Sequence, residues 1–217
     1  MAKTKIVSKQ RDAELTKKLI LDAAECEFAR RGLLGARTED MAIAADCTRA
    51  MIHYYFDSKE TLYQLVLERM FSEQAKVAQG FDVNQATPAE ALERFLRIIM
   101  TDLRENRNLP LIMLFEGIQN EGKYYKKIVI SAIYEPIQAI LERGKKEGVF
   151  RSDVNSLHTS INIMGACLFY TMSRNNLAHM FEGKPDILSK DLYDVHMEQA
   201  LQLVIDGVNS IDSNNSK

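Results

Sequence analysis

The stretch TRAMIHYYFDSKETL, residues 48–62, decides the interpretation of this chain. It places a histidine and three aromatic residues in succession at positions 53–56, and it turns polar directly before Ser58. A helix that packs against a core spreads its large side chains along one face, so this crowding needs another explanation. A short helix over residues 48–55, followed by a longer helix that Ser58 caps, accounts for the polar break.

Helical spacing of apolar residues continues on the N-terminal side of this stretch. Residues 12–31 carry apolar side chains three and four positions apart, and Gly32 ends the pattern. A second short helix is predicted over residues 38–45. The connector at residues 45–47 has about three residues, which is typical of a helix-turn-helix. In that motif the second helix lies in the major groove of DNA, and its first residues meet base edges.

The rest of the chain is also helical in pattern, with only ten glycines and four prolines in the whole sequence. Thr87, Pro88 and Glu90 form the signature of a capping box at the start of a helix. Further helices are predicted at about 109–119, 122–146, 155–181 and 189–209. The predicted fold is therefore all-α, with an N-terminal three-helix head and a C-terminal body of about six helices. The predicted domains are a DNA-binding domain at 1–57, an effector-binding and dimerisation domain at 58–211, and a flexible tail at 212–217.

Composition limits the classes of function. The net charge of −2 gives no global case for nucleic acid or an anionic membrane, but residues 1–18 hold six basic and two acidic residues. Cys26, Cys47 and Cys167 are odd in number and widely spaced, as reduced thiols in a cytoplasmic protein are. The N-terminus lacks the apolar segment of a signal peptide, and no apolar run approaches the ~18 residues that span a membrane.

Helical spacing divides the second helix of the motif into an inner and an outer side. Cys47, Ile52, Tyr55 and Phe56 are expected on the inner side. The outward residues predict DNA contacts: a guanine or phosphate for Arg49, close approach at Ala50, and a thymine methyl for Met51. The sugar-phosphate backbone is expected to meet three further side chains, those of His53, Tyr54 and Lys59.

A set of residues between positions 19 and 67 follows one known pattern. Its members are Ile20, Leu21, Asp22, Ala23, Ala24, Phe28, Ala29, Gly32, Thr38, Asp40, Met41, Ala42, Ala45, Ile52, Tyr54, Tyr55, Phe56, Ser58, Lys59, Glu60, Leu62, Val66 and Leu67. With these residues the stretch resembles the DNA-binding domain of the TetR (tetracycline-repressor) family of bacterial regulators. The resemblance implies a helical head that binds double-stranded DNA, and a divergent body that binds a small-molecule effector and dimerises.

The sequence departs from the family pattern around the turn. Asp46 stands where the family usually has glycine, Cys47 where it has valine, and His53 where tyrosine is common. Ala36 and Arg37 occupy positions where threonine or serine is frequent. Arg37 is therefore expected to bind a phosphate directly. Two hydroxyl side chains complete the predicted DNA contacts, those of Thr38 and Thr48.

The sequence lacks the signatures of several other classes of protein. A di-iron enzyme needs two Glu-x-x-His motifs, which this sequence lacks, and no Gly-rich phosphate loop or G-x-S-x-G motif is present. We therefore predict no enzyme, no cofactor and no metal site. Cys47 is interpreted as a small buried hydrophobe, with a redox sensor as its alternative. The remaining alternatives to a repressor are a ligand-dependent activator, a co-repressed regulator, and a helical binding module without DNA affinity.

The resemblance places an effector cavity within the body. The predicted lining is Phe71, Ile99, Leu103, Phe115, Glu116, Ile137, Asn162 and Ala166, with Glu116 or Asn162 orienting a largely apolar ligand. The last two long helices each carry a second apolar stripe. One stripe is Leu157, Ile161, Met164, Leu168 and Met172, and the other is Tyr193, Met197, Ala200, Val204 and Val208. Two such helices from each of two chains would form a four-helix homodimer interface.

Overall fold

The structure is a computed structural model, and it describes residues 2–125 and 131–210. Within these ranges the chain forms helices and no strand, apart from an isolated bridge between Phe150 and Asn209. The all-α prediction is confirmed. The predicted tail at 212–217 lies outside the described residues.

The chain divides into two compact units. Unit 1 comprises residues 1–71 and 111–128, and unit 2 comprises residues 72–110 and 129–217. The helix α4 (Lys59–Gln79) contributes residues to both units. The predicted domain boundary at 57/58 stays a prediction, because the two units reflect packing and not activity.

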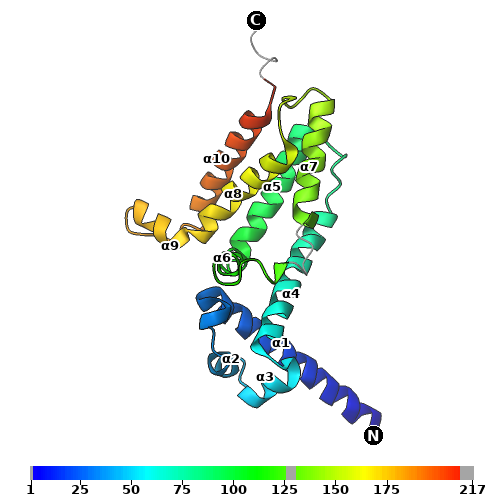
Figure 1. The fold of residues 1–217 in the computed structure, drawn as a ribbon, viewed down its shortest axis with the longest axis vertical. Coiled ribbons are helices and arrows are strands. Elements are labelled where there is room, and N and C mark those ends of the chain that lie inside the picture. Colours follow the sequence, from blue (N-terminus) through cyan, green and yellow to red (C-terminus); the bar gives the residue numbers. More distant parts are fainter. Residues whose placement is uncertain (1, 126–130, 211–217) are drawn as a thin grey trace, which may run out of the picture. The chain divides into compact units, whose positions relative to one another are not determined.

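Unit 1 holds the predicted helix-turn-helix (Figure 1). Its elements are α1 (Ala2–Gly35), α2 (Thr38–Ala44), α3 (Arg49–Phe56), the first part of α4 and most of α6 (Leu109–Asn120). The basic residues between positions 3 and 11 belong to α1, which begins at Ala2. Residues 2–11 contain neither glycine nor proline to stop the helix.

Gly32 interrupts α1 as expected, although the helix resumes for one turn after it. Its backbone has φ 66° and ψ −179°, a conformation that glycine adopts without a steric penalty. The side chain of Gln119 from α6 fills the gap: Oε1 accepts from the backbone N–H of Leu34 at 3.2 Å, and Nε2 donates to the Arg31 carbonyl at 3.4 Å. A Cβ atom on Gly32 would lie 2.3 Å from Oε1 of Gln119. Glycine is therefore required here for two reasons.

Polar side chains join the helices of unit 1 to one another. Arg69 of α4 binds two carboxylates of α1, those of Asp22 and Glu25, both at 2.6 Å. The carboxylate of Glu116 in α6 is fully buried and accepts from Tyr63 Oη at 3.0 Å and from the backbone N–H of Tyr124 at 2.8 Å. Burial, and then the Glu116 charge, raises the pKa of Tyr63. A buried carboxylate that is satisfied in this way holds α6 to α4.

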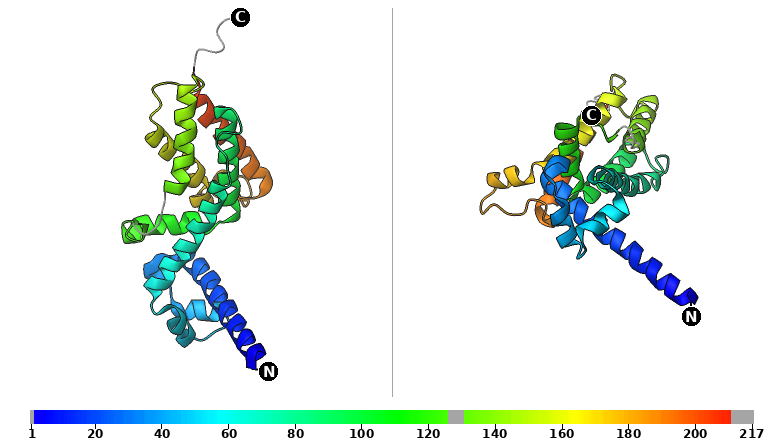
Figure 2. Two further views of the ribbon diagram at one scale, coloured as in Figure 1. Left: turned by 90° about the vertical axis from the view of Figure 1, so that its right-hand side faces the viewer. Right: turned by 60° about the horizontal axis from the view of Figure 1, so that its bottom comes forward.

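Unit 2 is a bundle of long helices, which lie side by side in all three views of Figures 1 and 2. They are α5 (Pro88–Glu105), α7 (Ser131–Lys146), α8 (Ser156–Met172) and α10 (Lys190–Val208). The predicted capping box at Thr87 and Glu90 is confirmed at the start of α5. Tyr193 of α10 is fully buried, and its hydroxyl donates to the Met100 carbonyl of α5 at 2.9 Å.

Two predicted helix boundaries are wrong. The helix predicted over 122–146 does not begin at 122, because residues 121–125 form a tight turn in which Glu121 and Gly122 have positive φ; α7 is described from Ser131. The helix predicted over 155–181 ends at Met172, and two short elements follow it. They are α9 (Arg174–Leu177) and the 3₁₀ turn η2 (Ala178–Met180), which project from the bundle in Figure 1.

Candidate nucleic-acid interface

The helix α3 begins with a side-chain cap. The hydroxyl of Thr48 accepts from the backbone N–H of Met51 at 3.3 Å, which satisfies one of the donors left free in the first turn. Thr48 itself has an extended backbone. The sequence therefore fixes the first residue of α3 as Arg49, at the end of the helix that meets base edges in a helix-turn-helix.

The end of α3 is fixed by Asp57 and His53. Asp57 has φ 64° and ψ −60°, so the chain cannot continue as a helix. The Nδ1–H of His53 donates to the Asp57 carbonyl at 2.7 Å, since a carbonyl oxygen only accepts. The other ring nitrogen, Nε2, can donate to a DNA phosphate only when the ring is protonated.

The division of α3 into two faces largely agrees with the prediction. Ile52 and Phe56 are 2 % and 5 % exposed and anchor the helix in unit 1. Tyr55 is half-buried, with the ammonium of Lys17 5.9 Å from the centre of its ring. The exposed side chains of the outer face are Thr48, Arg49, Ala50, His53 and Tyr54, whereas Met51 is half-buried. Tyr54 is 81 % exposed, so its ring is accessible to a ligand at this surface.

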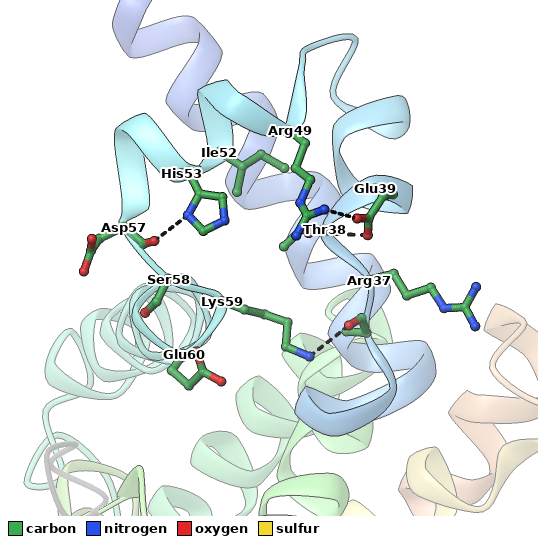
Figure 3. A pocket seen from close by; sticks show the side chains of 11 residues that line it. Arg37, Thr38, Glu39, Arg49, Ile52, His53, Asp57, Ser58, Lys59 and Glu60 are labelled. Atoms are coloured by element: carbon green, nitrogen blue, oxygen red, sulfur yellow. Dashed lines mark hydrogen bonds and ion pairs between the residues drawn. The ribbon is translucent and has the colours of Figure 1, made fainter.

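Beside α3 lies a hollow of about 380 Å³ (Figure 3). Its lining comes from α3, the starts of α2 and α4, and the segments that precede those two helices: Ala36, Arg37, Thr38, Glu39, Arg49, Ile52, His53, Asp57, Ser58, Lys59 and Glu60. Two helix N-termini, those of α2 and α4, contribute to this lining, and free backbone N–H groups at such ends favour anions. The predicted phosphate ligands Arg37, Thr38, His53 and Lys59 are thus gathered around one hollow.

Arg49 is held by a carboxylate that the sequence analysis missed. Its Nη1 lies 2.7 Å from Oε1 of Glu39, in the first turn of α2. A hydrogen bond from the backbone N–H of Glu39 itself, and then the charges of Arg49 and Arg37, keep the pKa of the Glu39 carboxyl below its usual range. Glu39 is therefore ionised at neutral pH. The ten-residue separation of the partners offers no helical or strand-like signal by which the sequence could have revealed this pair.

Lys59 has a role in the fold as well as a predicted role at DNA. Its Nζ donates to the carbonyl of Ala36, just beyond α1, at 3.0 Å. This bond ties the start of α4 to the segment that leads into α2. A phosphate at Lys59 would be bound by the donors that remain on the ammonium group.

Glu27 is a second residue of the interface that the sequence analysis missed. Its side chain is 6 % exposed, and its Oε1 accepts from the backbone N–H of Arg37 at 3.4 Å. Arg30 and Arg31 neutralise this carboxylate at 2.7 and 3.4 Å. The side chain of Arg37 points away from the other labelled residues of the hollow in Figure 3. Glu27 thus fixes the backbone at Arg37 and leaves the guanidinium outside.

The turn between α2 and α3 explains the departures from the family pattern. Asp46 has φ 49°, a left-handed conformation in which glycine has no steric cost and aspartate is tolerated. Cys47 is half-buried, and burial and then the neighbouring Asp46 raise the pKa of its thiol. A thiol with a raised pKa forms less of the reactive thiolate, which favours the packing interpretation of Cys47 over redox sensing.

The predicted effector contacts fall in both compact units. Phe71 and Phe115 belong to unit 1, whereas Ile99, Leu103, Ile137 and Ala166 belong to unit 2. Ile99, Leu103 and Ile137 are buried, Ala166 is half-buried, and Phe71 is buried with its ring 5.5 Å from that of Tyr125.

Neither predicted polar group is placed to orient a ligand. Asn162 is exposed on α8, and the Glu116 carboxylate already accepts from Tyr63, Asn120 and Tyr124. Asn162 is exposed and Glu116 is engaged in hydrogen bonds within unit 1. The rotation of each helix about its axis sets these directions, and the sequence alone did not give that rotation. In residues 2–125 and 131–210, no three His, Cys, Asp or Glu side chains gather as a metal ion requires. None of the helices described there has the length and apolar character to cross a membrane.

A capped reading helix, exposed outer side chains and a hollow edged by two helix N-termini define a helix-turn-helix DNA-binding protein. Comparison with known proteins agrees. Residues 20–66 match the family model of bacterial regulatory proteins of the tetR family, and residues 88–204 match the model of the tetracyclin repressor-like C-terminal domain. This chain belongs to the TetR family of transcriptional regulators.

Individual relatives cover most of the chain. It is 27 % identical to the HTH-type transcriptional repressor NicS of Pseudomonas putida over 170 residues, which are 76 % of this chain and 80 % of NicS. It is 28 % identical to the repressor KstR2 of Rhodococcus jostii over 147 residues, 63 % of this chain and 68 % of KstR2. The crystal structure of HlyIIR, a hemolysin II transcriptional regulator, matches with a TM-score of 0.66 and 25 % identity. That match covers 91 % of this chain and 99 % of HlyIIR.

Proposed function

We propose that this protein is a homodimeric repressor that binds a palindromic operator through α3 and is released by a small, largely apolar effector. The observation that carries the proposal is the outer face of α3. Arg49, Ala50 and Tyr54 are exposed there, while Ile52 and Phe56 anchor the helix from behind. Relatives such as NicS are named repressors, which supports the sign of regulation. Because regulators of this bacterial family act on DNA, we place the protein in the cytoplasm.

Dimerisation is supported by an exposed apolar line on each of two helices. On α8 it runs through Leu157, Ile161, Gly165 and Phe169, four residues apart. On α10 the exposed apolar side chains are Val195 and Leu203, on one face with the polar Gln199 between them and Gly207 one turn further on. Nothing would meet a Cβ atom at Gly165 or Gly207 within 4 Å, so a second chain can approach closely there. We propose that two copies pair through these lines as a four-helix interface.

Three residues of the predicted dimer stripes do not lie on the surface. Met164, Tyr193 and Val208 are 4 %, 0 % and 4 % exposed, so they pack inside their own chain. Val195 and Leu203 take their place, at 64 % and 72 % exposed. The sequence could not choose between the two faces of α10, because both carry apolar residues.

The operator can be found without knowing the regulated genes. Purified protein should enrich specific duplexes from a fragmented genomic library and should shift its own upstream region in a mobility assay. Two half-sites centred roughly 34–36 Å apart, or a multiple of that spacing, are expected for a dimer. Failure to enrich any fragment above a scrambled duplex would instead favour a ligand-binding module without DNA affinity.

The effector can be sought by thermal-shift screening, because a ligand specific to the folded state raises the melting temperature. The buried apolar residues Ile99, Leu103 and Ile137 remain the proposed contacts. A true effector should weaken operator binding, and DNA should weaken effector binding by the same factor, with a coupling of ~1–3 kcal/mol. A compound that tightens operator binding would make the protein a co-repressed regulator. One that stabilises it without changing operator affinity is not its effector.

A further inference from the structure

The DNA-facing hollow is not a simple basic patch. Its lining includes the cations Arg49 and Lys59, Arg37 with its guanidinium pointing outward, and three acidic residues at positions 39, 57 and 60. A carboxylate near the DNA backbone opposes binding, because each phosphate carries a negative charge. Affinity for DNA therefore does not explain why an acidic residue lies in this position.

Glu39 differs from the other two acidic residues because it binds the reading residue. Its carboxylate lies 2.7 Å from Nη1 of Arg49, and both side chains are more than half exposed, at 55 % and 60 %. Figure 3 shows the two side chains reaching toward each other from α2 and α3. The pair thus joins the two helices of the motif at the surface that faces DNA.

We infer that Glu39 is a positioning residue for Arg49 and raises the preference of the protein for its operator over other DNA. This inference rests on the proposed operator-binding function. The guanidinium group has five N–H donors in a rigid fork. Glu39 occupies one Nη1 donor and leaves others for the two-donor contact with guanine O6 and N7. Because Arg49 is already oriented, it loses less conformational freedom when it binds guanine.

The same ion pair lowers affinity for non-operator DNA. A phosphate that reaches the remaining donors of Arg49 must approach the negative carboxylate of Glu39, which repels it. Guanine carries no charge, so a contact with its edge avoids this repulsion. Glu39 therefore raises the ratio of operator affinity to non-operator affinity in two ways: it strengthens operator binding, and it weakens binding to other DNA.

The experiment compares two duplexes, the operator selected by the wild-type protein and a scrambled duplex of equal length. In Glu39→Gln, the ratio of the two affinities should fall roughly two- to fivefold, the range expected for an exposed ion pair. Binding to the scrambled duplex should become tighter and more salt-dependent. Glu39→Asp keeps the charge but is one methylene shorter, so the ratio should fall while the salt dependence stays near that of the wild type.

Two controls separate orientation from charge. Glu60→Gln removes a negative charge from the same hollow without touching Arg49, so both affinities should rise together and the ratio should hold. In an Arg49→Ala background, Glu39→Gln should no longer lower the ratio, because the partner that it orients is absent.

The inference is overturned if Glu39→Gln leaves the ratio unchanged, or lowers it equally with and without Arg49. A wild-type protein that selects no operator would refute the proposed function instead. The two failures are therefore distinguishable. Glu39 is exposed on α2, and circular dichroism of each variant verifies that it is folded.

Discussion

Arg49 and Lys59 line the same hollow, but only Arg49 is expected to contribute to the sequence preference for DNA. Arg49 stands in the first turn of the reading helix, so Arg49→Ala should cost ~1–3 kcal/mol of operator binding and relax the preference at one base pair. Lys59→Met keeps the aliphatic chain and removes the charge. It should weaken all duplexes alike and reduce the salt dependence by about one ion. Selected-site sequencing and salt titrations measure both effects.

The structure adds a control to that comparison. Because Nζ of Lys59 also donates to Ala36, Lys59→Met removes a hydrogen bond within unit 1, worth about 1 kcal/mol of stability. The free energy of unfolding should therefore be measured alongside DNA binding. A changed sequence preference in Lys59→Met, or an unchanged one in Arg49→Ala, would reverse the roles that we assign.

His196 predicts a pH dependence of stability. Its ring stacks on that of Tyr170 with centroids 3.7 Å apart, and its Nε2 is buried with no hydrogen-bond partner among the described residues. Burial lowers the pKa of His196 below its ordinary value of 6.5. Between about pH 6.5 and the lower folded-state pKa, the unfolded chain binds more protons than the folded one. Stability is therefore lost as the pH falls through this window.

The variant His196→Phe should lose less stability on acidification than the wild type. The slope of its unfolding free energy against pH should correspond to up to about one proton fewer taken up on unfolding. Urea unfolding at several pH values and a fixed protein concentration measures the slope. Tyr170→Phe keeps both the imidazole and the ring that stacks on it, so this variant serves as the matched control and should keep the wild-type slope. Equal slopes for His196→Phe and the wild type would show that this ring does not govern the effect.

At the scale of elements, the turn between α2 and α3 contains backbone strain that a single substitution can relieve. Asp46 occupies a left-handed conformation at φ 49°. Asp46→Gly should raise the free energy of unfolding by up to about 1 kcal/mol, since glycine has no Cβ to clash there. Asp46→Ala keeps the Cβ and should be less stable than wild type. If the glycine variant were no more stable than the alanine variant, backbone strain at this turn would be excluded.

The starts of α3 and α5 depend mostly on local chemistry. Thr48 caps α3 and Thr87 caps α5 through hydrogen bonds to residues three positions later, so a reader of the sequence can place both starts. The point at which a helix breaks or ends depends more on residues that are distant in the sequence. α1 resumes after Gly32 because Gln119, from a distant helix, supplies the missing hydrogen bonds.

At the scale of the whole molecule, the exposed line on α10 predicts the assembly. Leu203→Glu would place a charge in an apolar interface, at a cost of about 3 kcal/mol or more per dimer, and raise the dimer dissociation constant roughly a hundredfold. Sedimentation should then show monomers. Ile43→Glu is the matched control: Ile43 is 79 % exposed on α2, outside the proposed interface, and the variant should remain dimeric. A Leu203→Glu protein that stays dimeric would place the interface elsewhere.

The sequence by itself determined the all-α fold, the helix-turn-helix and most of the outward set on α3, because helical periodicity and caps act over a few residues. Only the tertiary structure decided which side chains meet across helices. It paired Glu39 with Arg49, Lys59 with Ala36, and Gln119 with the break at Gly32. Such contacts depend on the angle and phase at which helices pack, and many sequences with the same periodicity would pack differently.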